Sequence, residues 1–261
     1  MTKREFSLDI EDGIATVTLN WPDRVNAMGS DFSADFGRVL DRIESKSGVR
    51  VMIFTGSGKA FCGGGDLNEI MSPDTTDMEG EFELIRGYNR IARRIYQLDI
   101  PVIAAVNGPA AGGGVGLALA CDFAIAAESA RYDLLFHRVG LSGADVGVPW
   151  LLNRRIGPVL TSYYVLTAGS IDAVTGHRLG LFAEVVAQND LMPAARAAAG
   201  KIVDTPEPAV RISKLALRSS LNMDLNTNLE LEAYLQSYAF RTPGHKKRVG
   251  EYRLRIAKKG K

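Results

Sequence analysis

Two glycine-rich loops carry the residue types and spacing best suited to chemistry. The first, GSGKAFCGGGDL, spans Gly56 to Leu67 and follows the apolar run from Val49 to Thr55. The second lies in PVIAAVNGPAAGGGVGLALACD, where Gly112-Gly113-Gly114 precede a small-residue helical pattern. Glycines at a helix start remove every Cβ that would keep a ligand from the backbone, and the first helical N–H groups have no intrahelical acceptor. Together the loops predict a donor site for developing negative charge.

Neither loop fits a nucleotide-binding motif. In the downstream loop Gly112 and Gly114 are followed by Leu117, where G-x-G-x-x-G needs its third glycine. In the upstream loop Ala60 stands where a phosphate loop needs serine or threonine, and Ile53 where it needs its first glycine. The alternative for each loop taken alone is a tight turn that packs a strand closely against a helix.

Proton-transfer candidates gather in the irregular stretch FHRVGLSGADVGVPW, from Phe136 to Trp150. Apolar neighbours around Asp145 would disfavour its charged form and bring its pKa toward the working pH, as a general acid or base requires. The alternative is a turn or capping aspartate. His137 can titrate near neutrality, although a lone loop histidine is more often structural. Phe136 and Trp150 are expected to line a substrate pocket.

Composition indicates an ordinary globular protein. The 261 residues are 46% apolar, and 31 Lys and Arg nearly balance 30 Asp and Glu, so no global field favours nucleic acid or a membrane surface. Cys62 and Cys121 form neither a disulfide framework nor a metal-ligand pattern, and we expect no metal site. MTKREFSLDI lacks an apolar signal region, and no apolar run approaches a membrane span, so we expect a cytoplasmic protein.

Strands and helices alternate through the first part of the chain, which predicts βα units around a mostly parallel sheet. A hairpin is expected between Phe6 and Asn20, with its turn at Glu11-Asp12-Gly13, and a helix capped by Ser30 or Asp31 follows it. The remaining strands and helices of this part are expected at Val49 to Thr55, Phe82 to Leu98, Pro101 onward and Phe123 to Ala127.

From Leu151 the pattern is nearly all helical. Helices are expected at Ile171 to Glu184, Met192 to Val203, Ala209 to Leu221, Leu225 to Phe240 and in the basic tail from Pro243. The chain therefore divides into a core over residues 1–190 and a helical region over residues 191–261. Helices with many apolar positions beyond the last strand need a partner surface, which favours an oligomer.

Over essentially its full length the chain resembles the crotonase superfamily, whose familiar member is enoyl-CoA hydratase. The matching pieces are Asn26-Ala27, both glycine loops, and a later region that ends in RLGLFAEVV. The resemblance implies an α/β fold with a crotonase-like ββα spiral core and a helical C-terminal trimerisation region, in a homotrimer or homohexamer. It also implies an acyl-CoA thioester substrate held between the loops, with coenzyme A as part of that substrate and no separate cofactor.

The resemblance assigns roles to the loop residues. The backbone N–H groups of Gly65 and Gly113 correspond to the oxyanion hole, where preorganised donors stabilise an enolate or tetrahedral oxygen. The expected contacts to coenzyme A are Arg24, Val25, Ala27, Gly63, Asp66 and Leu67, with Lys59 and Arg24 for its phosphates. Lys59 is equally well explained as a solvated turn residue.

The acid and base positions depart from those of enoyl-CoA hydratase. Its two glutamates fall on Gly116 and Phe136, neither of which can move a proton. Asp145 stands near the position where dienoyl-CoA isomerases and dehalogenases of this superfamily carry a catalytic aspartate.

Three functions remain open. The first is a hydratase/isomerase-like enzyme with Asp145 moving the proton. The second is an acyl-CoA or β-diketone hydrolase with Asp145 and His137 activating water. The third is a non-catalytic acyl-CoA binder. A glutamate placed at Gly116 tests the first of these: gain of crotonyl-CoA hydration would show a hydratase scaffold that lacks one acid, and no gain would leave the chemistry open.

Overall fold

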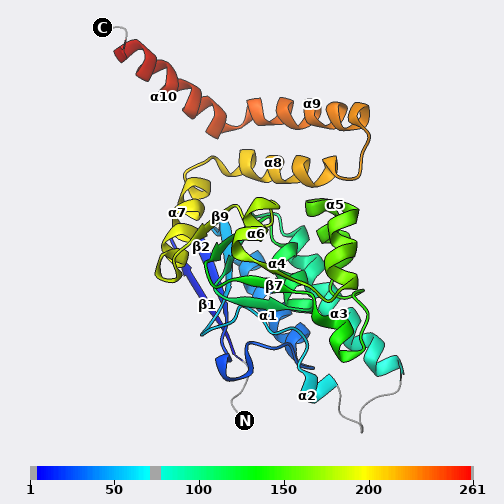
Figure 1. The fold of residues 1–261 in the computed structure, drawn as a ribbon. Helices are drawn as coiled ribbons and strands as arrows, with labels where there is room; N and C mark the ends of the chain where they lie inside the picture. The colour runs from blue at the N-terminus through cyan, green and yellow to red at the C-terminus, as the bar shows by residue number, and fades with distance from the viewer. Residues whose placement is uncertain (1–4, 71–77, 260–261) are drawn as a thin grey trace.

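The computed structural model describes residues 5–70 and 78–259 (Figure 1). The chain opens with an antiparallel hairpin of β1 (Phe6–Glu11) and β2 (Ile14–Leu19). Both turn residues have left-handed backbone, with φ of 49° at Asp12 and 78° at Gly13, as a two-residue hairpin turn requires. The hairpin prediction is confirmed.

Four further strands extend the sheet in parallel, in the order β1-β2-β3-β4-β6-β9. They are β3 (Val51–Gly56), β4 (Val102–Val106), β6 (Phe123–Ala127) and β9 (Glu184–Val186). Every residue of β3 and β4 is buried, because helices cover both faces of the sheet. On one face Met52 and Phe54 join the core cluster that includes residues of α1 (Phe32–Ser45) and α3 (Met78–Gln97). On the other face Val51 and Ile53 pack with α7 (Leu191–Val203).

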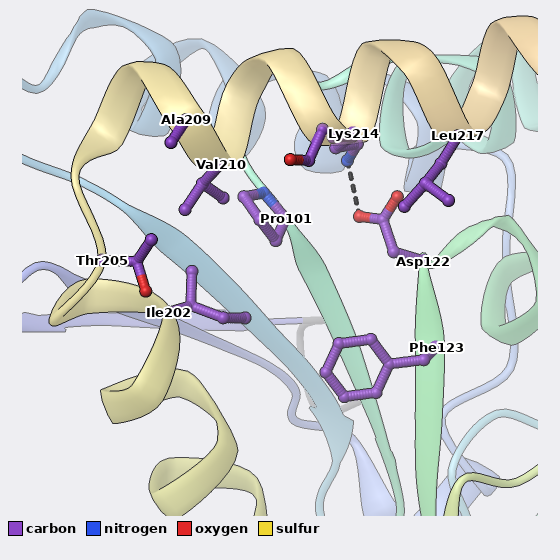
Figure 2. A pocket seen from close by; sticks show the side chains of 10 residues that line it. Pro101, Asp122, Phe123, Ile202, Thr205, Ala209, Val210, Lys214 and Leu217 are labelled. Carbon is purple, nitrogen blue, oxygen red and sulfur yellow. Dashed lines mark hydrogen bonds and ion pairs between the residues drawn. The ribbon is translucent and has the colours of Figure 1, made fainter. Parts of the chain in front are cut away.

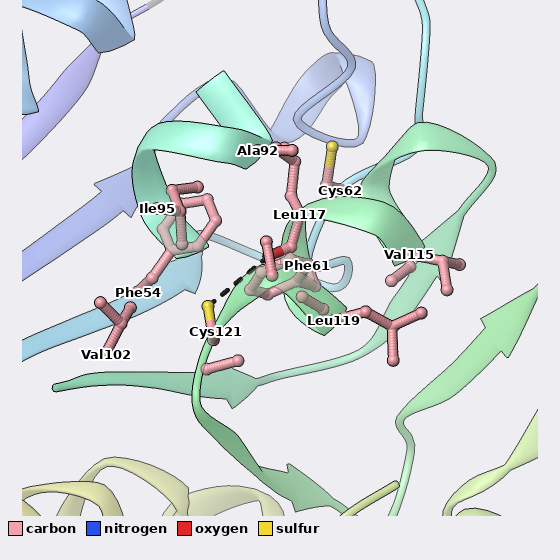
Figure 3. Close-up of a cluster of buried hydrophobic side chains, with 14 of the residues drawn as sticks. Phe54, Phe61, Cys62, Ala92, Ile95, Val102, Val115, Leu117, Leu119 and Cys121 are labelled. Atoms are coloured by element: carbon pink, nitrogen blue, oxygen red, sulfur yellow. Dashed lines mark hydrogen bonds between the residues drawn. The ribbon is translucent and has the colours of Figure 1, made fainter. Parts of the chain in front are cut away.

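A second, three-stranded sheet consists of β5 (Pro109–Ala111), β7 (Arg131–Asp133) and β8 (Ser170–Asp172). The helix α4 (Gly113–Ala120) begins directly after β5, and every one of its residues is buried. Leu117 and Leu119 of α4 lie among Phe54, Phe61 and other core side chains, as Figure 3 shows. A helix that is apolar on every face is stable only when other elements surround it, and α4 accordingly lies inside the hydrophobic core.

The region after Leu151 contains more strand than the sequence indicated. The stretch from Ile171 to Glu184, expected as one helix, instead contains most of β8, the short α6 (Ala173–Arg178) and the first residue of β9. The pairing of β8 with β7 and of β9 with β6 outweighs the helical preference of the alanine-rich residues. Asp172 ends β8 and caps α6, since its side chain accepts the N–H of Thr175 at 2.7 Å.

Other connections also differ from expectation. The stretch from Phe136 to Trp150, expected as irregular, contains most of the 3₁₀ turn η2 (Leu135–Val139) and the start of α5 (Val148–Leu166). Asp31 precedes α1 but makes no side-chain capping bond, and Glu69 accepts the N–H of Ser30 at 2.9 Å. The remaining short elements are η1 (Pro22–Arg24), α2 (Leu67–Ile70) and η3 (Gln188–Asp190).

The last three helices extend beyond the sheet. Figure 1 shows α8 (Glu207–Ser220) and α9 (Leu225–Arg241) stacked on the core, and α10 (Pro243–Lys259) pointing away from it. Because α7 packs on a face of the sheet, the helices that extend past that face begin at α8, which one ion pair joins to the sheet. Exposed apolar side chains on α9 and α10 are Leu225, Leu229, Tyr234, Tyr238, Phe240, Tyr252, Leu254 and Ile256.

An ion pair joins α8 to the sheet. The Nζ of Lys214 lies 2.6 Å from Oδ2 of Asp122 and donates to the Ile100 carbonyl at 2.7 Å. The same carboxylate oxygen accepts the Val102 N–H at 2.7 Å. Figure 2 shows this pair at the wall of a groove of about 280 Å³ between the sheet and α8. Burial lowers the pKa of Lys214, and Asp122 opposes that shift.

We predict that Lys214→Ala lowers the free energy of unfolding by about 3 kcal/mol, because it leaves Asp122 without its cation. Urea unfolding measures this loss. Lys201→Ala, which removes an exposed lysine from α7, is the matched control and should change stability by less than about 0.5 kcal/mol. Equal stability of the two variants would show that the pair does not hold α8 to the core.

Candidate active site

The two glycine loops are joined by backbone hydrogen bonds. The N–H of Phe61 donates to the Pro109 carbonyl at 2.9 Å, and the N–H of Ala111 donates to the Cys62 carbonyl at 2.9 Å. Cys62 and Ala110 form a parallel bridge between these bonds. The loop after β3 is therefore fixed alongside β5, immediately before α4 begins.

Missing Cβ atoms allow the loops to approach this closely. A Cβ on Gly64 would lie 2.6 Å from the Ala111 carbonyl oxygen and 3.5 Å from the Gly113 nitrogen. A Cβ on Gly114 would lie 2.4 Å from the Cys62 carbonyl oxygen. Gly64 also has a φ of 84°, which glycine adopts without strain. Any larger residue at these positions would separate the loops.

The same pairing brings two backbone donors into adjoining loops. Met28 donates to the Gly64 carbonyl and accepts from the Asp66 N–H, both at 2.7 Å, so the Gly65 N–H between them points away from Met28. Gly113 is the first residue of α4. Within residues 5–70 and 78–259, neither the Gly65 N–H nor the Gly113 N–H donates to an acceptor. These are the two donors that the sequence singled out for an oxyanion hole, and they lie in adjoining loops.

Two buried asparagines hold the loops, and the sequence did not predict this role. Asn26 is fully buried, and its carboxamide donates to the Ser57 and Ala60 carbonyls at 2.9 and 2.8 Å. Asn107 donates to the Gly58 and Ala60 carbonyls at 3.1 Å and accepts the Gly56 N–H at 3.1 Å. For Asn107 the available signal was its place directly after the apolar strand β4, where its amide can replace missing backbone partners.

Asp145 lies beside the Gly113 donor. Its Oδ2 is 3.0 Å from the position that a Cβ on Gly113 would occupy. Burial raises the pKa of Asp145 from 3.8 to about 6, and a hydrogen bond from the Val146 N–H opposes the shift. A carboxyl group with a pKa near 6 can both accept and return a proton near neutral pH.

Position 116 is not an empty acid site. A Cβ on Gly116 would lie 2.3 Å from the Val146 carbonyl oxygen and 2.8 Å from the Val146 Cβ. A glutamate at position 116 would therefore displace the loop that carries Asp145, because that loop fills the space. Phe136, at the other glutamate position, is buried, and its ring lies 3.4 Å from the Cβ position of Gly112. It thus forms a wall next to the turn into α4.

His137 and Trp150 are both exposed. His137 is exposed on η2, one residue after the buried Phe136. Trp150 is 40% exposed, packs edge-on against Tyr96 at 5.6 Å, and carries the Arg154 guanidinium over its ring at 3.6 Å. The Trp150 ring, at the start of α5, therefore lies between Tyr96 of α3 and Arg154 one turn further along α5.

The residues expected to contact coenzyme A lie together. The Gly63 N–H donates to the Val25 carbonyl at 2.8 Å, so the segment around η1 runs beside the first glycine loop. Arg24 pairs with the buried Asp66 at 2.6 Å and keeps a third of its side chain exposed. Val25 and Leu67 are exposed, Ala27 is buried, and Lys59 is exposed on the preceding turn.

Other chemistry finds little support in the described residues. Burial raises the pKa of the Cys62 thiol to about 12, so Cys62 is not a ready nucleophile. Among the described residues, no three His, Cys, Asp or Glu side chains group as metal ligands would. No helix in the same ranges combines the length and apolar character needed to cross a bilayer.

A pair of backbone donors beside one desolvated carboxyl group is the equipment of an enzyme that stabilises an oxyanion and moves a proton. Residues 9–255 match the enoyl-CoA hydratase/isomerase family, and the chain belongs to this family.

Its relatives include both reaction types. The chain is 34% identical to a 1,2-epoxyphenylacetyl-CoA isomerase of Escherichia coli, over 95% of each chain. It is 36% identical to a short-chain-enoyl-CoA hydratase of Clostridium acetobutylicum, over 92% of this chain and 90% of that one. An enoyl-CoA hydratase structure from Bacillus anthracis superposes with a TM-score of 0.91 at 30% identity, over 96% of each chain. The predicted superfamily, fold and enzyme class are confirmed.

We predict that Gly113→Ala reduces turnover about 10²–10³-fold, since its Cβ would lie 2.6 Å from Met28 Cε and 2.8 Å from Val146 Cγ2 and would displace the donor. Steady-state kinetics with an enoyl-CoA thioester measures the loss. Gly200→Ala is the control, because a Cβ there meets no atom within 4 Å and alanine favours the α7 helix. Full activity of a folded Gly113→Ala enzyme would argue against the Gly113 donor.

Proposed function

We propose that the protein binds an acyl-CoA thioester with its carbonyl oxygen on the Gly65 and Gly113 N–H groups and moves a proton with Asp145. The observation that carries this proposal is the short separation between the Asp145 carboxylate and Gly113. A base at that point is next to the carbon whose proton becomes acidic when the thioester oxygen is stabilised as an enolate.

One carboxyl group favours isomerisation over hydration. Adding water across a double bond requires one group to activate the water and another to supply or hold the second proton. Here Gly116 and Phe136 provide neither. A single acid/base can instead remove a proton from one carbon and return it to another, so we propose a double-bond isomerase.

The hydrolase alternative gains nothing from the geometry. It required Asp145 and His137 to activate water together, but His137 is exposed on η2 whereas Asp145 is partly buried. The raised pKa of Asp145 equally disfavours a purely passive binder, since a desolvated carboxyl group is costly to keep without a chemical role.

We propose that coenzyme A enters as part of the substrate and that no further cofactor takes part. Its adenine and pantetheine would lie along residues 24–27 and 63–67, which adjoin through the Gly63–Val25 hydrogen bond. Lys59 is exposed and available to a phosphate, whereas Arg24 already holds Asp66. A cytoplasmic location remains part of the proposal, in keeping with the two free cysteines.

We propose that the chain forms a homotrimer or a homohexamer. The exposed apolar side chains of α9 and α10 support this, since they need a covering surface. We predict a mass in light scattering of three or six times the 28.2 kDa of one chain. A monomer at micromolar concentration would contradict the prediction.

We predict that Asp145→Asn lowers kcat about 10²–10⁴-fold with acyl-CoA binding largely intact, because the amide keeps the shape and loses the titrating proton. In the wild-type enzyme kcat/KM should rise with pH through about 6, as Asp145 becomes the carboxylate base. Turnover of 3-enoyl-CoA and of crotonyl-CoA, each measured from pH 5 to 8, tests both points.

The control is Asp12→Asn, which makes the same change on the exposed hairpin turn. Wild-type turnover by Asp145→Asn would remove Asp145 from the mechanism. Faster hydration of crotonyl-CoA than isomerisation of 3-enoyl-CoA would overturn the one-acid isomerase.

A further inference from the structure

Val146, next to Asp145, has an unusual backbone conformation. Its φ of 42° lies in the left-handed region, which a β-branched side chain rarely adopts and which costs on the order of a few RT. The residue is also completely buried. A conformation of this kind persists only where the surrounding structure holds it in place.

Two glycines of α4 provide the surface that holds Val146. A Cβ on Gly113 would lie 2.8 Å from Val146 Cγ2, and a Cβ on Gly116 would lie 2.8 Å from Val146 Cβ and 2.9 Å from its Cγ1. Gly113 and Gly116 are three positions apart and thus share one helix face. Val146 occupies the flat patch that they leave, where any other residue pair would project side chains.

The packing of Val146 on these two glycines determines where the Asp145 carboxyl group lies. On one side Val146 packs on α4, and on the other the Val148 N–H donates to the Asp145 carbonyl at 2.8 Å. Two contacts therefore hold the backbone on the C-terminal side of Asp145, and Oδ2 lies 3.0 Å from the Cβ position of Gly113. The buried side chain of Val146 also keeps water from the α4 side of the carboxylate.

Few polar groups compete for this carboxylate. Among the described residues, no side chain forms a hydrogen bond or ion pair with it. The titratable group coupled to it from the neighbouring loop is Cys62, whose pKa of about 12 keeps the thiol neutral over the working range. On the side that faces α4, the position of the Asp145 carboxylate is therefore set mainly by the packing of Val146 on the helix.

We propose that Val146 is a positioning residue of the active site. By packing against Gly113 and Gly116, it orients the Asp145 carboxyl group toward the oxyanion donors and excludes water from it. The inference rests on the proposed role of Asp145 in proton transfer. It also explains the glycine at position 116, since a glutamate there and a seated Val146 exclude each other. One acid on the loop replaces one acid on the helix.

The test compares Val146→Ala with Val148→Ala. Val148 is equally buried and lies two residues away, but its side chain is not among the atoms nearest to the Cβ positions of Gly113 and Gly116. Both variants shorten a buried valine, so a merely structural role predicts similar losses of stability and activity. A positioning role predicts that Val146→Ala alone lowers kcat, by about tenfold to a hundredfold, with KM unchanged.

A second readout follows Asp145 without any activity assay. Because burial raises the native pKa of Asp145 above its unfolded value, the carboxyl group favours folding below pH 4 and loses that contribution as pH rises through about 6. Asp145→Asn should therefore become increasingly stabilising between pH 4 and 7 in urea unfolding. In the Val146→Ala background that increase should shrink, as water lowers the pKa, and in the Val148→Ala background it should persist.

Gly116→Ala reaches the same contact from the helix side. Alanine is the better helix former, so a loss here comes from the new Cβ displacing Val146. We expect it to reproduce the fall in kcat and the weaker pH dependence, and it serves as the second variant if Val146→Ala does not fold. An unchanged pH dependence in both folded variants would overturn the positioning role. Wild-type turnover by Asp145→Asn would instead refute the proposed function and leave the stability measurement valid.

Discussion

Two stretches of backbone approach one another more closely than any side chain would allow, and the site depends on that contact. Where Gly64 meets Ala111 and Gly114 meets Cys62, a Cβ would lie 2.6 and 2.4 Å from a carbonyl oxygen. Each contact is next to one of the proposed oxyanion donors, Gly65 in one case and Gly113 in the other. The glycines therefore set the separation of the two N–H groups, and the buried carboxamides of Asn26 and Asn107 keep the flanking turns from relaxing.

Local pattern was enough to predict the elements that lead into this contact. The hairpin turn at Asp12-Gly13, the continuous apolar strands and the fully apolar α4 each have a signal within a few residues. The strands β8 and β9 have three residues each, and pairing with β7 and β6 fixes them rather than their own composition. Sequence alone could not place them.

In the candidate site, too, some features could be predicted from local sequence and others could not. The glycine loops predicted a donor site, the resemblance placed its donors at Gly65 and Gly113, and Asp145 was proposed because the usual positions hold residues that cannot carry a proton. The left-handed backbone of Val146 has no local signal, because valine ordinarily avoids it and only the α4 surface makes it favourable. Trp150 was expected in the pocket from its nearness in sequence, yet the first turns of α5 direct it toward Tyr96.

With Asp145 on a loop beside α4, the proposed site contains one carboxylate, and therefore one negative charge that the reaction can transfer. In the proposed mechanism Asp145 takes a proton from the substrate, and the negative charge passes from its carboxylate to the thioester oxygen at the Gly65 and Gly113 donors. Burial raises the pKa of Asp145, which makes the carboxylate a stronger base, while the donors lower the pKa of the carbon acid. Both effects bring the two pKa values closer together, and proton transfer in either direction then has a small driving force to overcome. An isomerase needs this balance because the proton must return to the substrate, whereas a hydratase must also bind and activate a water molecule.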